Sequence, residues 1–240
     1  MGLDAAVLRS RRVQAFVALG AAVGVWFVVA PHLKPLALWP AVIVVAAAVL
    51  PGTLLLVLVV LPLRTRRWIL PAAVVLALVA WGCTHEGWGL AANFAKLWAA
   101  VFAGWAFLWL FEELSWVVVV AVIIPFVDAI SVWRGPTHSI TAHHFGIYTS
   151  VAVAFIVPGG GAAYLGPPDI LFYGLFLAAA ARWELRVVWT WVAMTGMYSL
   201  TIVIATAADV SGLPALPFLS FGLLVANADL LWRRLRPASS

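Results

Sequence analysis

Residues 166–174 read Gly-Pro-Pro-Asp-Ile-Leu-Phe-Tyr-Gly, and they open an apolar run that continues to residue 183. Asp169 therefore stands at the mouth of an apolar segment. A second acid, Asp128, lies inside the preceding apolar run, residues 114–133. Carboxylates in hydrocarbon-like surroundings are costly to maintain and usually mark a functional site. These two acids are therefore the candidate functional residues of the chain.

The composition is that of a membrane protein. Of the 240 residues, 65% are hydrophobic and 10% are charged, and the mean hydropathy is +1.10. A soluble domain is about half apolar and a quarter charged. The net charge of +5 does not indicate a nucleic-acid partner, because the arginines stand in short clusters between apolar runs, as loop charges that orient a membrane protein do.

The apolar runs predict an all-α bundle of membrane-spanning helices, each needing about 20 apolar residues. The predicted spans are 13–30, 36–63, 69–84, 90–111, 114–133, 169–183, 187–208 and 213–232. The second run is too long for one straight crossing and contains Pro51-Gly52, so it is either one kinked helix or two short ones. The chain thus forms a single membrane domain, residues 1–240, with eight or nine spans.

Loop charge favours eight spans with the N-terminus inside, because Lys and Arg collect on the cytoplasmic side. That arrangement places most basic residues in the cytoplasm: Arg9, Arg11, Arg12, Arg64, Arg66, Arg67, Arg182, Arg186, Arg233, Arg234 and Arg236. The remaining basic residues, Lys34, Lys96 and Arg134, then lie toward the outer side of the membrane. Asp229, close to Asn227 and Arg233 in the sequence, predicts an ion pair at the interface.

Residues 134–168 form the longest connection. It contains three histidines, a short apolar stretch from Val151 to Val157, and the turn sequence Pro-Gly-Gly-Gly at 158–161. The apolar stretch is β-branched and ends at a turn, so it predicts a strand or a membrane-dipping segment. The histidines are His138, His143 and His144. Their spacing does not place them on one helical face and no nearby acid completes a ligand set, so we expect no metal site.

The two aspartates are expected at similar depth in the membrane. Asp128 lies six residues before Arg134, which is about 9 Å at 1.5 Å per residue. Asp169 enters from the same side on the next, antiparallel span. Carboxylates that meet there would share one proton near neutral pH, as in aspartic proteases. One would activate water and the other would protonate a peptide carbonyl oxygen. Intramembrane acids also serve proton relays and ion pathways, which remains the alternative.

Three segments in order resemble the presenilin and signal peptide peptidase family of intramembrane aspartyl proteases. They are Phe-Val-Asp-Ala-Ile-Ser-Val at 126–132, Leu-Gly-Pro-Pro-Asp-Ile-Leu-Phe-Tyr-Gly at 165–174 and Pro-Ala-Leu-Pro at 214–217. The resemblance covers residues 114–232, with 1–113 as scaffold helices. It implies that Asp128 and Asp169 are the catalytic pair and that Gly166 and Pro168 occupy glycine positions of the G-x-G-D motif.

The resemblance also assigns a family motif, P-A-L, to Pro214, Ala215 and Leu216 at the opening of the last helix, beside the active site. It implies that the apolar strand, Val153 to Pro158, lies where substrate is held extended. The implied activity is hydrolysis of transmembrane or signal-peptide-like substrates in a prokaryotic cell membrane, with no cofactor. The implied partners are membrane-spanning peptides and the lipid bilayer.

The chain departs from the family pattern at two places. Val127 stands where the family has tyrosine before the first aspartate, and Pro168 replaces the glycine before the second. Proline lacks the free N–H and close backbone approach of glycine, but it suits the first turn of a helix. The alternatives are therefore a proton-coupled transporter or channel that uses the same acids, and a catalytically inactive relative that binds membrane helices.

Overall fold

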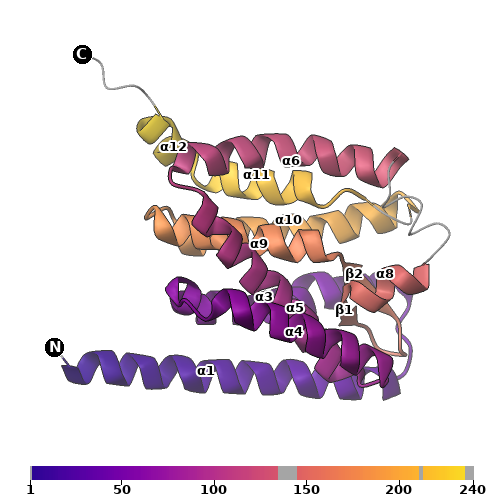
Figure 1. Ribbon diagram of the computed structural model, residues 1–240. Coiled ribbons are helices and arrows are strands. Elements are labelled where there is room, and N and C mark those ends of the chain that lie inside the picture. The colour runs from indigo at the N-terminus through magenta and orange to yellow at the C-terminus, as the bar shows by residue number, and fades with distance from the viewer. Residues whose placement is uncertain (1, 135–144, 211–212, 236–240) are drawn as a thin grey trace, which may run out of the picture.

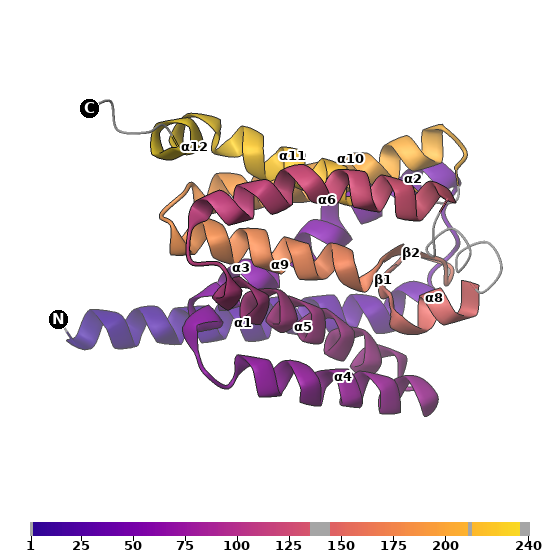
Figure 2. The same cartoon turned by 45° about the horizontal axis from the view of Figure 1, so that its top comes forward.

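The apolar runs of the sequence form helices that lie side by side, with a two-stranded sheet at one end of the bundle (Figures 1 and 2). The computed structural model describes residues 2–134, 145–210 and 213–235. The helices are α1 Gly2–Val29, α2 Leu38–Val44, α3 Leu50–Val60, α4 Ile69–His85, α5 Gly89–Phe107, α6 Leu114–Arg134, α8 Phe145–Val151, α9 Pro167–Arg182, α10 Val187–Ala207, α11 Leu216–Ala226 and α12 Ala228–Leu235. The strands are β1 Val153–Ile156 and β2 Ala162–Leu165.

The surface of the bundle is apolar, as in a membrane-embedded protein. Among the described residues, five helical segments are long and apolar enough to cross a membrane: Ser10–His32, Leu38–Thr65, Gly89–Leu110, Leu114–Arg134 and Val187–Ala207. Large apolar side chains point outward, among them Leu78, Trp81 and Ile130, which are 63%, 73% and 66% exposed. Helices that are apolar on their outer faces as well as their inner ones are typical of membrane spans. The expected all-α membrane bundle is therefore supported.

The long second run forms one continuous helical segment rather than two helices. Between α2 and α3 the backbone widens into a π-helical stretch, Val45–Val49. Pro51, the second residue of α3, has no N–H to donate. In a π-helix each carbonyl bonds the N–H five residues on, which for Ala46 would be that of Pro51. The Ala46 carbonyl instead accepts a hydrogen bond of 2.6 Å from Ser199 Oγ on α10. The wider turn accommodates the proline, and the neighbouring helix satisfies the carbonyl.

The prediction of a single span over 213–232 is wrong. The segment is divided at Asn227 into α11 and the amphipathic α12. The buried Asn227 side chain donates to Thr190 Oγ1 at 2.8 Å and to the Leu223 carbonyl at 2.9 Å, and its Oδ1 accepts the Arg186 N–H at 3.0 Å. These bonds hold the end of α11 against the start of α10, so α11 stops after 11 residues.

Among the helices of residues 114–232, α9 is the most buried. Every residue from Gly174 to Ala180 is buried. Two glycines let its backbone approach α5 directly. A Cβ on Gly104 of α5 would overlap the Leu171 carbonyl oxygen, and a Cβ on Gly174 would lie 3.0 Å from the Val101 carbonyl oxygen. The position of Asp169 is thus set by close backbone contact between α9 and α5.

The arginine clusters belong to the start of α1, the α3–α4 and α9–α10 connections and α12. These parts of the chain lie at the end of the bundle away from the sheet (Figures 1 and 2). Several of these arginines bond to carbonyl groups at helix ends. Arg64 donates to Ala181 O at 3.1 Å, and Arg182 donates to Leu108 O at 3.0 Å. A cation at the C-terminal end of a helix also interacts favourably with the helix dipole. The basic residues predicted to share one side of the membrane therefore share one end of the bundle.

We expect Gly104→Ala to lower the stability of the bundle by about 2 kcal/mol, because the added methyl group forces α5 away from α9. Thermal unfolding followed by circular dichroism in detergent micelles measures the change. Gly196→Ala is the matched control, since nothing lies within 4 Å of its added Cβ. An unfolding temperature for Gly104→Ala equal to that of the control would contradict the close contact.

Candidate functional site

The structure brings Asp128 and Asp169 to the same end of the bundle. Asp128 lies in the last two turns of α6, and Asp169 lies in the first turn of α9. The two helices run antiparallel, and the ends that carry the aspartates are both next to the sheet (Figure 2). Both side chains are half-buried. The charge of Asp128 acts directly on Asp169, so the carboxylates lie within electrostatic range of each other.

Asp128 is held by the segment that resembles the P-A-L motif. The Leu216 N–H, at the start of α11, donates to Asp128 Oδ2 at 3.0 Å. The Ala215 N–H makes a second, smaller favourable interaction with the same carboxylate. Pro214, Ala215 and Leu216 are all buried. Because a helix N-terminus has free N–H groups and a partial positive charge, it is a suitable partner for a carboxylate.

Asp169 occupies a similar position at the N-terminus of its own helix. Gly166 is the N-cap residue of α9, followed by Pro167 and Pro168 in the first turn. The Gly166 N–H donates to Asp169 Oδ2 at 2.9 Å, as in one half of a capping box. Proline in the first turn removes N–H groups that a helix leaves unpaired in any case. The expectation that Pro168 suits a helix start is confirmed, and its side chain is exposed.

The predicted strand is present, but it is one arm of a hairpin. β1 pairs antiparallel with β2, from Val153 opposite Leu165 to Ile156 opposite Ala162. Asn93 on α5 binds the other edge of β1 as a strand would. Its Nδ2 donates to Ala154 O at 2.9 Å, and its Oδ1 accepts the Ala154 N–H at 2.7 Å. Both edges of β1 are therefore occupied, which fixes the hairpin immediately before Asp169.

Tyr148 on α8 is a functional candidate that sequence reasoning missed. Burial raises the pKa of its phenol above the usual range, and the charges of Asp169 and Asp128 raise it further. Its ring edge would lie 3.8 Å from a Cβ on Gly166. The phenol is thus a third polar group at the aspartate pair. The sequence offers no signal for it, because α8 lies within the connection between the two spans.

Two further tyrosines fix the first turn of α9 against α10. Tyr198 Oη donates to the Asp169 backbone carbonyl at 2.8 Å, and the hydroxyl groups of Tyr173 and Thr195 are hydrogen-bonded at 2.8 Å. The two tyrosine rings are stacked, with centroids 5.9 Å apart. All three side chains are buried. Tyr173 follows Asp169 by four residues on one helix face, a spacing that could have indicated this role.

Other predicted residues lie apart from the aspartate pair. Val127 is 53% exposed on the outer surface of α6, so the family tyrosine has no counterpart there. His138, His143 and His144 lie outside the described residues. No group of three potential metal ligands occurs in the part of the chain that the structure describes. Asp229 does form an ion pair, but its partner is Arg186, at 2.7 Å, and not the nearby Arg233.

The arrangement can therefore support acid–base chemistry by two carboxylates and a phenol beside an ordered hairpin. Comparisons with protein-family models, with curated proteins and with solved structures find no match to this chain.

Proposed function

We propose that the chain is an intramembrane aspartyl protease of the presenilin and signal peptide peptidase type, with Asp128 and Asp169 as its catalytic pair. One observation carries the proposal. Three segments far apart in the sequence converge at one end of an apolar bundle, and the amide of Leu216 binds Asp128. A chance pair of acids in two membrane helices would have no reason to meet the third segment as well.

The proposed reaction uses water and the two carboxylates. The ionised carboxylate accepts a proton from water as its oxygen attacks the carbonyl carbon of the peptide bond. The protonated carboxylate donates to the carbonyl oxygen, as in aspartic proteases. Collapse of the tetrahedral intermediate breaks the C–N bond as the proton taken from water is delivered to the leaving amine. The former carbonyl oxygen returns its proton to the carboxylate that donated it, which leaves a new carboxyl group and restores the pair.

The substrates would be transmembrane or signal-peptide-like segments. A helix must be unwound locally before water can attack one of its peptide bonds. The hairpin supports this step, because β2 ends at Leu165 and the chain continues through Gly166 into the turn that bears Asp169. Because β2 and Asn93 occupy both edges of β1, a substrate held extended would lie along β2, with its backbone close to both aspartates.

The distribution of charge supports a multi-pass orientation with the arginine-rich end in the cytoplasm. The aspartates lie at the opposite end of the bundle, so the hairpin and the active site would be nearer the outer face of a prokaryotic cell membrane. This orientation resembles that of signal peptide peptidase more than that of presenilin.

Tyr148 takes part in this proposal as a positioning residue. In the family, a tyrosine stands beside the first aspartate on the same helix, whereas here Val127 faces outward. Tyr148 brings a phenol to the pair from α8 instead. Because its pKa is raised, the hydroxyl group keeps its proton at physiological pH and can donate a hydrogen bond to a carboxylate or to the substrate.

Replacing either aspartate, by Asp128→Asn or Asp169→Asn, is expected to lower the rate of cleavage of a model membrane substrate by three orders of magnitude or more. Cleavage in proteoliposomes is followed by mass spectrometry of the products. Asp209→Asn is the matched control, because Asp209 is exposed beyond the end of α10. Activity that survives both substitutions contradicts the proposal, and an inactive wild-type chain that still binds membrane helices favours the inactive relative.

Tyr148→Phe is expected to lower kcat about tenfold or more while KM changes by less than about twofold, because a donor that acts in the transition state is lost. Tyr164→Phe is the control, since the Tyr164 ring lies edge-on to that of Tyr148, with centroids 6.4 Å apart. Equal changes in kcat for the two substitutions would show that Tyr148 contributes only through packing.

A proton-coupled transporter or channel is the second candidate, and a separate observation favours it. Buried hydroxyl and amide groups continue from the aspartates along α10 toward the arginine-rich end. They are Tyr198, Thr195, Thr190 and Asn227, and the last two are hydrogen-bonded at 2.8 Å. The fold therefore aligns more polar groups in this direction than the apolar runs of the sequence suggest.

Proton flux into vesicles loaded with a pH-sensitive dye separates the two candidates. The protease is expected to cleave substrate and to leave the proton permeability of the vesicles unchanged. A relay would instead show flux that Asp169→Asn abolishes and that Thr190→Val reduces, without proteolysis. Thr84→Val is the control, because Thr84 bonds only within its own helix in the described structure, to Ala80 O at 2.7 Å.

A further inference from the structure

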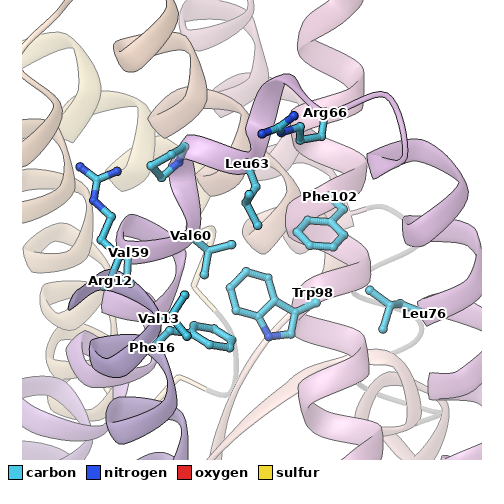
Figure 3. A pocket seen from close by; sticks show the side chains of 11 residues that line it. Arg12, Val13, Phe16, Val59, Val60, Leu63, Arg66, Leu76, Trp98 and Phe102 are labelled. Atoms are coloured by element: carbon cyan, nitrogen blue, oxygen red, sulfur yellow. The ribbon is translucent and has the colours of Figure 1, made fainter. Parts of the chain in front are cut away.

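A large groove opens between four helices at the end of the bundle opposite the aspartates. Its volume is about 850 Å³, within the range of small-molecule sites, about 300–1,000 Å³. It is lined by Arg12, Val13, Phe16, Val59, Val60, Pro62, Leu63, Arg66, Leu76, Trp98 and Phe102. These residues come from α1, α3, the turn that follows α3, α4 and α5 (Figure 3).

The inner wall of the groove is aromatic and preformed. Trp98 contacts Phe16 with ring centroids 5.8 Å apart, and it contacts Phe102 at 5.6 Å. Val60 and Leu63 face these rings (Figure 3). Nothing in this wall can form a hydrogen bond except the indole N–H. The deep part of the groove therefore suits a hydrocarbon chain.

The rim of the groove carries two arginines. Figure 3 shows the guanidinium groups of Arg12 and Arg66 on the same side of the apolar residues. Three other arginines at this end are bonded within the protein: Arg64 and Arg182 cap helix ends and Arg186 pairs with Asp229. The side chains of Arg12 and Arg66 have no hydrogen-bond or ion-pair partner among the side chains that the structure describes. Their positive charge is thus available to a ligand.

The charged and apolar parts of the groove are separated along the helix axis. Phe16 lies four residues beyond Arg12 on α1, which is about 6 Å deeper at 1.5 Å per residue. A ligand with an anionic head and an apolar tail matches this order. Guanidinium groups bind phosphate oxygens by paired, charge-assisted hydrogen bonds. Basic pockets between membrane helices on the cytoplasmic side are typical sites for anionic headgroups.

We infer that this groove binds one anionic phospholipid of the bilayer, with its phosphate between Arg12 and Arg66 and an acyl chain against Phe16, Trp98 and Phe102. Lipid is favoured over a soluble phosphate compound because most of the lining is apolar. In addition, α1, which forms one wall of the groove, is loosely covered, with its apolar Val13 and Val17 57% and 61% exposed. The site is separate from the aspartates, and the inference does not depend on the proposed protease activity.

Native mass spectrometry of the protein released from detergent measures the binding. The probes are phosphatidylglycerol and phosphatidylcholine with identical acyl chains. We expect the fraction of wild-type protein that retains a bound lipid to be at least tenfold higher with phosphatidylglycerol than with phosphatidylcholine. The double substitution Arg12→Gln with Arg66→Gln should remove this preference. The control, Arg11→Gln with Arg67→Gln, removes the same charge from exposed neighbours outside the groove and should leave the preference intact.

Val60→Trp fills the groove without changing its charge, and it should reduce retention of both lipids. Inorganic phosphate at millimolar concentration should not displace phosphatidylglycerol, because it cannot occupy the apolar part. Equal retention of the two lipids by the wild-type chain overturns the inference, as does an equal loss in the Arg11 and Arg67 control. A dimer that Val60→Trp dissociates would assign the groove to a second copy of the chain and would also overturn it.

Discussion

Backbone polar groups inside an apolar bundle must all find partners, since a membrane offers no water to bond them. The irregular parts of this chain show how that requirement is met. Ser199 bonds the Ala46 carbonyl that Pro51 leaves without a donor, and Asn93 bonds the outer edge of β1. At the opposite end, Arg64 and Arg182 bond carbonyls at helix ends. Each of these carbonyls, and the outer edge of β1, is therefore bonded by a polar side chain from another element.

The same requirement places the two aspartates. Asp128 accepts the free N–H at the start of α11, and Asp169 accepts the N–H at the start of α9. Helix N-termini that would otherwise leave N–H groups unbonded thus hold carboxylates at defined positions. In both carboxyl groups, Oδ2 accepts this hydrogen bond. The phenol of Tyr148 is close enough to feel the charge of both side chains.

The two ends of the bundle are chemically different. The sheet end gathers acids and phenols, while the other end gathers arginines. Helix α9 starts at the acidic end and finishes at the basic one. Close backbone packing at Gly104 and Gly174 sets its position in the bundle. The groove at Arg12 and Arg66 belongs to the basic end. This charge separation along the bundle is the basis both of the proposed orientation and of the two proposed sites.

The sequence by itself determined the class of structure, since continuous apolar runs permit only helices that cross or line a membrane. It also identified Asp128 and Asp169, because a carboxylate within such a run is conspicuous. Tertiary structure alone decided the partners of these acids. The contacts of Tyr148 with the aspartates, the bonds of Asn93 to Ala154 and the Asp229–Arg186 pair all join residues at least 20 positions apart in the chain. Helix periodicity indicates which face of a helix is apolar. It contains no information about which polar side chain of a distant helix will contact that face.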